Sequence, residues 1–217
     1  MKTKTVLLLI LIILFLLQCT EEKSSTEYSY NANYTDSNLR IDGVLDEDAW
    51  KNSEAIVLKI NKTGEIVSGA STLTLVRTCY DKEYLYIAYE CNDVDIWSEF
   101  ENRDDHLWEK DAAEIFIDSD GILNTYYEIQ VSPNNVLFDA HLAIPTKTND
   151  DEIIAFDIEG IQTAVSIEGT LNMHEDIDKK WTVEIAIPFA GLSEETASYN
   201  SKNWRINYFR MNHDRAS

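Results

Sequence analysis

The sequence predicts an all-β fold, an antiparallel β-sandwich (jelly-roll-like) of about nine strands in which helices are only short turns. Three observations predict it. Apolar and polar residues alternate through a series of short segments, as they do in strands that bury one face. Turn-forming residues such as Asp120-Gly121 and Pro133-Asn134-Asn135 separate these segments at the spacing of a sandwich. Hydrophobic residues make up 44% of the 217 residues, which is ample for a packed core.

The expected elements follow one another in order along the chain. Short helices are expected at 46–52 and 189–195. The alternation is clearest in YLYIAYEC at 84–91 and AAEIFID at 112–118, where all residues of one parity are apolar. The longest irregular stretch is 92–110, and long loops inside compact β domains often carry binding sites. The expected strands are 55–60, 72–80, 84–91, 112–118, 125–132, 136–142, 163–168, 181–187 and 204–211.

The N-terminal segment has the pattern of a signal peptide. Lys2 and Lys4 precede an unbroken apolar run over 6–17, and residues 1–18 contain no acid. That run is shorter than the roughly 20 residues that a membrane-spanning helix needs. The sequence Leu16-Leu17-Gln18-Cys19 resembles the lipobox of bacterial lipoproteins, which implies lipidation at Cys19. The alternative is an ordinary secretory signal in which Cys19 is incidental.

These patterns divide the chain into three parts. We expect a signal peptide at 1–18, a lipidated cysteine with a flexible tether at 19–38, and one domain at 39–217. The mature protein would then be exported and lipid-anchored at the bacterial cell envelope or surface, or otherwise periplasmic or secreted.

Composition and motifs exclude several classes of function. The 39 acidic residues against 18 basic residues give a net charge of -21, which repels the phosphate backbone of nucleic acids. Phosphate-binding loops, nucleophile elbows and zinc-protease motifs are absent from the sequence, so we expect no enzyme. In the expected hairpin, Cys79 and Cys91 lie about 20 Å apart along the strands, too far for a disulfide, which predicts two free thiols.

Five segments, in the right order over about residues 40–212, resemble the motifs of family 9 carbohydrate-binding modules. The resemblance implies a jelly-roll-like β-sandwich that binds sugar without catalysis, often with structural calcium and often attached to or associated with a glycoside hydrolase. The segments are IDGVLDEDAW at 41–50, LYI at 85–87 with ND at 92–93, WEKDAAEIFID at 108–118, WTVEIAIP at 181–188 and WRIN at 204–207.

The resemblance also implies a sugar site. It makes Trp108 the stacking platform and Glu114 a hydroxyl partner, with Gln130 where sugar-binding members carry an arginine. The chemistry agrees, because an exposed indole stacks on the apolar face of a sugar ring while carboxylates and amides bind its rim of hydroxyls. The alternatives are that Trp108 plugs the core and that Glu114 is an ordinary surface or core acid.

Three further residues are weaker candidates for sugar contact. Trp97 lies in the middle of the long loop and offers a second stacking face, whereas Trp50, Trp181 and Trp204 are expected in the core. Asn207 and Arg210 lie on opposite faces of one strand by parity, so at most one of them points into a given cleft. The second tryptophan of sugar-binding members lies beyond the strand at 204–211. The sequence stops before that stretch, which predicts that the C-terminal part of the module is missing.

Acidic residues crowd the long loop. Asp93, Asp95 and Asp111 are the candidate metal ligands, because Ca²⁺ accepts carboxylate oxygens in loose geometry and the resemblance implies structural calcium. The alternative is a solvated acidic loop with no metal.

The sequence therefore predicts non-catalytic carbohydrate binding at the cell envelope, in support of polysaccharide breakdown or capture. The expected partner is an oligo- or polysaccharide, with a possible glycoside hydrolase beside it and membrane contact only through the lipid. One alternative is a structural or adhesive surface lipoprotein without sugar binding. Another is a haem-binding electron-transfer sandwich, for which Met173, His174, Met211 and His213 are the candidate axial ligands.

Overall fold

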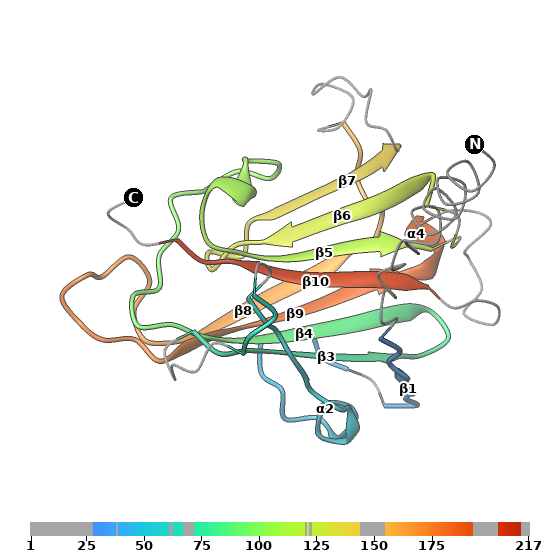
Figure 1. The fold of residues 1–217 in the computed structure, drawn as a ribbon, viewed down its shortest axis with the longest axis horizontal. Coiled ribbons are helices and arrows are strands. Elements are labelled where there is room, and N and C mark those ends of the chain that lie inside the picture. The colour runs from blue at the N-terminus through green and yellow to red at the C-terminus, as the bar shows by residue number, and fades with distance from the viewer. Residues whose placement is uncertain are drawn as a thin grey trace, which may run out of the picture. The chain divides into compact units, whose positions relative to one another are not determined.

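Two β-sheets make up the fold in the computed structural model, which describes residues 28–37, 39–60, 63–66, 72–119, 121, 123–143, 155–192 and 204–213. Figure 1 shows the two sheets as layers. The six-stranded sheet has the order β1 (Asn33–Tyr34), β3 (Thr74–Tyr80), β4 (Tyr84–Asn92), β9 (Lys180–Pro188) and β8 (Gln162–Glu168), with β2 (Ile56–Val57) also paired to β3. The four-stranded sheet has the order β10 (Arg205–Met211), β5 (Ala112–Asp118), β6 (Thr125–Val131) and β7 (Leu137–Ala143).

The predicted β-sandwich is confirmed, and each predicted strand has a counterpart. The least regular is the first, where only Ile56–Val57 is a strand and Lys59 adds an isolated bridge to Ile66. The two predicted helices are present as α2 (Asp48–Asn52) and α4 (Phe189–Leu192). The prediction did not include β1, which lies within the stretch expected to be a tether. This strand has two residues and pairs parallel with β3, so no period-2 pattern could announce it.

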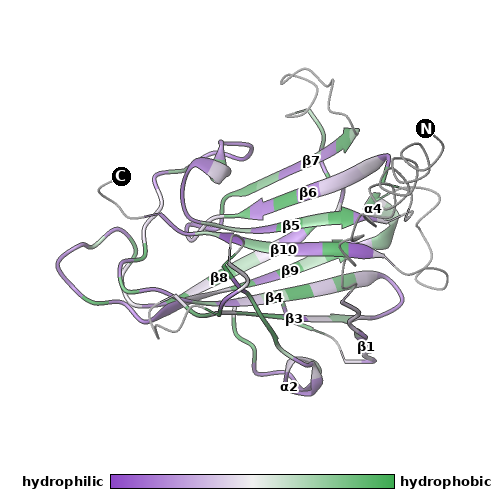
Figure 2. Ribbon diagram, in the orientation of Figure 1, coloured by the Kyte–Doolittle hydropathy of each residue, from purple (hydrophilic) through white to green (hydrophobic). Residues whose placement is uncertain are grey.

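The core lies between the sheets and consists of the apolar residues of one parity on each strand. Ile87 and Tyr89 of β4, Ile115 of β5, Ile129 of β6 and Ile185 of β9 are all fully buried there. Figure 2 shows hydrophobic and hydrophilic stretches interleaved along the strands, as expected where each strand buries one face. Both described cysteines are buried free thiols, as predicted: they lie at different levels of the hairpin, since Cys79 is opposite Tyr86 and Cys91 is opposite Thr74.

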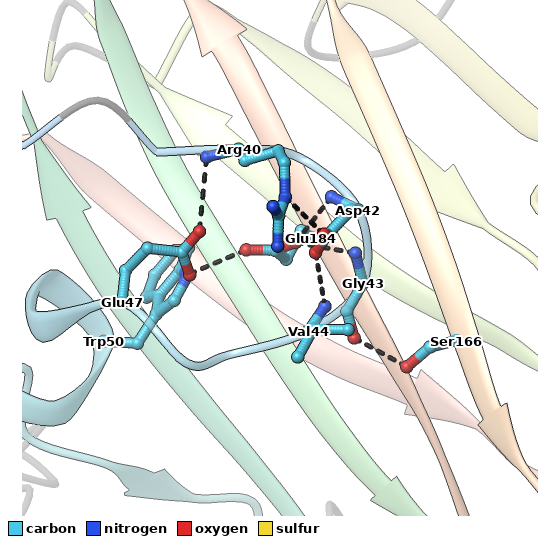
Figure 3. Close-up of polar contacts among 8 residues, drawn as sticks. All are labelled: Arg40, Asp42, Gly43, Val44, Glu47, Trp50, Ser166 and Glu184. Carbon is cyan, nitrogen blue, oxygen red and sulfur yellow. Dashed lines mark hydrogen bonds and ion pairs between the residues drawn. The ribbon is translucent and has the colours of Figure 1, made fainter.

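The outer face of the six-stranded sheet is covered by α2 and the turn before it. Trp50 of α2 is 1% exposed, and its indole nitrogen donates to Oε1 of Glu184 on β9 at 2.7 Å. The other oxygen of Glu184 accepts from the backbone N–H groups of Asp42 and Gly43 at 2.9 and 2.7 Å (Figure 3). Gly43 has φ +83°, and a Cβ there would lie 2.6 Å from the backbone nitrogen of Ser166. The IDG motif is therefore a turn clamped onto β8 and β9.

The outer face of the four-stranded sheet is covered by the long loop between β4 and β5. This loop contains one 3₁₀ turn, η1 (Leu107–Glu109), and its apolar residues Phe100 and Leu107 pack on Phe138 and Ala140 of β7. The outer face of the four-stranded sheet, beside this loop, carries the residues predicted to bind sugar. No helix in the described part of the chain is both long enough and apolar enough to cross a membrane.

The signal peptide, Cys19 and most of the tether lie outside the described residues.

Candidate functional site

The four-stranded sheet brings Glu114 and Gln130 together on its outer face. The two residues are direct partners in the register of β5 and β6, so their side chains leave the sheet on the same side. Gln130 is in turn the partner of Phe138 on β7. The Trp108 ring lies against Phe138, with ring centroids 5.2 Å apart in a T-shaped arrangement. The three residues predicted as the sugar site therefore lie on one face: Gln130 is one cross-strand step from the Phe138 that Trp108 contacts, and Glu114 is two steps from it.

Trp108 is 39% exposed at the junction between η1 and β5, as expected for a platform. One face of its indole is occupied, because His106 stacks on it with ring centroids 4.5 Å apart and an angle of 20°. His106 itself is exposed. A ligand ring therefore has two ways to stack on Trp108: on the part of the indole that His106 leaves uncovered, or in place of the exposed imidazole that now covers it.

Glu114 and Gln130 belong to a set of three polar side chains, and the third member is Glu128. The amide nitrogen of Gln130 donates to Oε1 of Glu114 at 2.8 Å and to Oε1 of Glu128 at 2.6 Å. The two carboxyl groups also share a hydrogen bond with each other. Sequence analysis missed Glu128, since it is one of 39 acids, although its parity in YYEIQ places it beside Gln130.

The three residues of this set are buried to different extents. Glu114 is 3% exposed and Gln130 is 0% exposed, whereas Glu128 is partly exposed. Burial, together with the adjacent Glu128 carboxylate, raises the pKa of Glu114 to about 7. Burial also raises the pKa of Glu128, although the hydrogen bond from Gln130 acts to lower it. The pair therefore tends to hold a proton at neutral pH.

Trp97 does not offer the second stacking face that was expected. It is 7% exposed, its indole nitrogen reaches the carbonyl oxygen of His213 at 3.4 Å, and Lys110 covers the ring at 5.1 Å from its centroid. The reason is that the long loop folds inward instead of standing out in solvent. An unpatterned tryptophan gives no sign of this in the sequence.

Asn207 and Arg210 lie on opposite faces of β10, as their parity predicted. Asn207 is exposed on the outer face that also carries Glu114. Arg210 points to the other side, where its guanidinium donates to Asp93 at 2.6 Å and lies 5.7 Å from the ring centroid of Trp181. Its side chain is 5% exposed. Arg210 is therefore an interior counter-ion and does not face the Trp108 platform.

The three candidate metal ligands contact different partners and do not converge on one point. Asp93 binds Arg210, and Asp111 accepts from the backbone N–H of His213 at 2.6 Å, with a hydrogen bond between the two acids. Asp95 turns to the imidazole of His174 at 3.0 Å. Burial raises the pKa of Asp111 to about 7. Among the described residues no group of three or more acids, histidines or cysteines is placed to hold a metal ion, so these residues fit Ca²⁺ poorly.

The candidate haem ligands do not form a pair around a common space. Met211 packs in the apolar cluster of Phe100 and Leu107, and Met173 is 45% exposed in a loop. His174 is exposed and contacts Asp95 at 3.0 Å.

A pocket of about 520 Å³ lies on the other sheet, beside the clamped IDG turn. Its lining includes Arg77, Glu90, Glu168 and Lys180. These charges already neutralise one another, since Lys180 lies 3.2 Å from Glu90 and 3.3 Å from Glu168, and Arg77 also pairs with Glu90. The pocket is therefore a less suitable ligand site than the Trp108 face.

Comparison with known proteins gives one family over most of the chain. The model of the carbohydrate family 9 binding domain-like family matches residues 41–212. An extracellular protein of Arthroderma benhamiae is 29% identical over 148 residues, which are 63% of this chain and 62% of that protein. Endo-1,4-beta-xylanase A of Thermotoga maritima is 35% identical over 89 residues, which are 41% of this chain and 8% of the enzyme. The chain thus spans less than two thirds of the length of either relative.

Solved structures share the fold. A family 9 carbohydrate-binding module of Caldicellulosiruptor kristjanssonii in complex with cellotriose superposes with a TM-score of 0.54 at 19% identity, over 86% of this chain and 79% of that one. The complex of a family 9 module from the same organism with glucose gives a TM-score of 0.56 at 19% identity, over 85% and 78%.

Proposed function

Because this chain belongs to the carbohydrate family 9 binding domain-like family, whose members are non-catalytic binding modules, we propose that it binds uncharged oligo- or polysaccharide on the Trp108 face. The observation that carries the proposal is the pairing of a 39% exposed indole with a carboxyl–amide set one cross-strand step away. An apolar ring face and a nearby rim of hydrogen-bonding groups are what a sugar ring requires.

Isothermal titration tests this proposal. The panel is glucose, cellobiose, xylobiose and cellotriose, chosen because glucose and cellotriose occupy the related solved modules. Trp108→Ala should lower the affinity about 30-fold, since central aromatic residues dominate binding energies. Tyr34→Ala is the matched control: Tyr34 is 40% exposed but lies on β1 of the other sheet, and its loss should leave binding unchanged. Flat heats for the whole panel with folded wild-type protein would remove the proposal.

The cellular setting is a further part of the proposal. We infer that the protein is exported and anchored through a lipid on Cys19, so that the module holds polysaccharide or its fragments at the cell envelope. The basic start and the apolar run over 6–17 support this, as does the description of one relative as extracellular. Membrane fractionation of wild type and Cys19→Ala tests it. An equal membrane fraction for both would contradict lipidation.

A role in polysaccharide breakdown is supported by the match to part of a xylanase. A glycoside hydrolase acting on the captured glycan is the expected partner. Co-purification of a glycan-cleaving activity with the wild type, and its loss with Trp108→Ala, would support that role, while cleavage that persists in the variant would contradict it.

A further inference from the structure

The long loop between β4 and β5 contacts the edge strand β7 on both of its faces. Phe138 and Ala140 of β7 point to the outer face of the sheet, where Phe100 and Leu107 of the loop pack on them. Asp139 lies between them in the sequence, so its side chain points to the inner face. The loop reaches Asp139 as well, through an ion pair, so it encloses β7 from both sides.

Asp104 attaches the loop to the backbone of β7. Its N–H donates to the carbonyl oxygen of Leu137 at 3.0 Å, and its carboxylate accepts from the N–H of Asp139. The backbone of Asp104 has φ +65°, a conformation that is uncommon for residues other than glycine. These hydrogen bonds therefore fix the loop at one position along the strand.

Arg103 links the loop to β7 and to the segment that follows it. Its Nη2 contacts the carboxylate of Asp139, and its Nε lies 2.5 Å from Oδ1 of Asp157, in the segment between β7 and β8. Asp139 is 0% exposed, and its second oxygen accepts from the N–H of Ile158. Among the described residues, no lysine, histidine or other arginine pairs with Asp139 or Asp157. Arg103 is therefore the counter-ion of a buried acid, and its removal would leave that charge uncompensated.

The apolar and the ionic contacts constrain the loop differently. The packing of Phe100 and Leu107 is favourable but non-directional, so it tolerates a shift of the loop along β7. The hydrogen-bonded ion pairs of Arg103 are directional and hold one geometry. Trp108 directly follows Leu107, and its ring meets the sheet at Phe138. The position of the indole above the sheet is therefore set by where the loop is fixed on β7.

We propose that Arg103 and Asp104 form a clasp that fixes the long loop on β7 and so holds Trp108 in place on the sugar-binding face before a ligand arrives. Arg103 acts through Trp108, so it is a positioning residue and not a sugar contact. The inference rests on the proposed function and adds to it the residues that preorganise the stacking platform.

Loss of the clasp should lower the affinity without removing any sugar contact. The apparent affinity for a ligand falls in proportion to the fraction of molecules in the binding-competent state. Arg103→Ala should therefore weaken cellotriose binding about fivefold, because the loop must then be ordered on binding, and this loss is smaller than that of Trp108→Ala. Native-state proteolysis of the loop should speed up by a similar factor, since it tracks the population of the open form.

The experiment combines titration calorimetry with cellotriose and digestion by a glutamate-specific protease. Cleavage after Glu101 and Glu109, both exposed in the loop, is followed by mass spectrometry and needs no ligand. Arg103→Lys keeps the charge but not the planar fork that reaches two carboxylates at once, so it should restore part of the affinity. If Arg103→Ala alone does not fold, Arg103→Ala combined with Asp139→Asn removes the unpaired buried charge as well.

Arg77→Ala is the matched control. Arg77 also pairs with an acid, Glu90, but on the outer face of the six-stranded sheet. A general loss of stability from breaking an ion pair is common to both alanine variants. Arg77→Ala should leave the cellotriose affinity and the cleavage of the loop unchanged.

The outcomes separate the clasp from the proposed function. If wild type binds cellotriose and Arg103→Ala binds it equally well, the inference falls and the proposed function stands. This holds even if the loop of Arg103→Ala is cleaved faster, because the clasp would then hold the loop without positioning Trp108. An Arg103→Lys variant that binds no better than Arg103→Ala would contradict an ionic clasp, whereas graded affinities with matching cleavage rates support it. If wild type binds no sugar, the proposed function falls together with the positioning role.

Discussion

Two buried glutamates, one on the outer face of each sheet, differ in what surrounds them. Glu184 is 0% exposed and accepts three hydrogen bonds, from Trp50 Nε1 and from the N–H groups of Asp42 and Gly43. Glu114 is 3% exposed and has one donor, Gln130, with a second acid beside it. Burial raises the pKa of both, but at Glu184 the three donors oppose the rise.

The comparison shows how to separate a structural acid from a binding acid. Both sit at a similar depth, so burial does not distinguish them. The carboxylate of Glu184 is satisfied within the protein and has nothing left to offer a ligand. Glu114 and its neighbours keep an unpartnered acceptor and an unneutralised charge, which is free energy that a ligand can recover. Such a set costs stability in the unliganded protein.

The largest effect should come from Glu184→Ala, which leaves three donors without an acceptor. We expect a loss of about 3 kcal/mol or more in the free energy of unfolding, because each buried unsatisfied donor costs about 1–3 kcal/mol. Urea-induced unfolding measures it. Glu114→Ala, by contrast, removes a carboxyl that strains its surroundings and should cost less than Glu184→Ala. The comparison fails if the order is reversed.

A smaller loss should follow from Gly43→Ala, which disturbs the clamp without removing Glu184. The new Cβ would lie 2.6 Å from the Ser166 nitrogen at a residue with φ +83°. Strain of this kind costs about 1–3 kcal/mol. Gly64→Ala is the matched control, since Gly64 has φ +70° but nothing within 4 Å of the added Cβ. The difference between the two variants in urea unfolding isolates the contact from the backbone conformation, and equal losses would show that the contact is irrelevant.

The pH dependence of stability should distinguish the two glutamates further. The pKa of Glu114 rises from 4.5 to about 7 on folding, so the folded state favours its protonated form. The stability that this contributes is present below about pH 4.5 and is lost as the pH rises through about 7. Asp111, with its pKa also raised to about 7, acts in the same direction. We expect a melting temperature a few degrees lower at about pH 8 than at about pH 5.5, and a smaller drop in Glu114→Gln. An unchanged drop in that variant would mean that other carboxyls with raised pKa values, such as Asp111 and Asp139, account for it.

The smallest effect should be that of calcium. Stabilisation by Ca²⁺ bound at Asp93, Asp95 and Asp111 stays a prediction, and Arg210 already supplies positive charge to this group. A ligand that binds only the folded state raises the melting temperature. Thermal unfolding in EDTA and in millimolar Ca²⁺ at matched ionic strength tests it. Equal midpoints would leave Arg210 as the cation of the group.

The sequence predicted the fold well because the evidence for it was periodic. Strands such as β4 and β5 bury one parity and expose the other, and the parity of β10 separated Asn207 from Arg210 correctly. What parity does not give is which side faces the core, so it could not assign Arg210 to Asp93. The strand β1 has only two residues, which is too short to show an alternation of apolar and polar residues.

The candidate site was predicted in part. The family resemblance pointed to Trp108, Glu114 and Gln130, because the signature at 108–118 carries the first two and Gln130 lies where sugar-binding members carry an arginine. The structure then pairs Gln130 with Glu114. Trp97 could not be placed, since a loop has no period and its burial depends on contacts with His213 and Lys110 far along or across the chain. Glu128 was not predicted because its importance depends on its hydrogen bond with Gln130 and on its partial burial. Neither property can be deduced from the residues next to it in the sequence.

The clamped IDG turn has a mechanical consequence. Tension applied from the N-terminal side along residues 33–50 reaches β1, which lies parallel to β3, and then the turn held by Glu184. Two backbone hydrogen bonds, the Trp50 bond and the Ser166–Gly43 bond at 2.6 Å share that load with β8 and β9. A module tethered at this end would therefore carry tension first through β1, at one end of the six-stranded sheet, and then through the clamped turn into β9 and β8 at the other end.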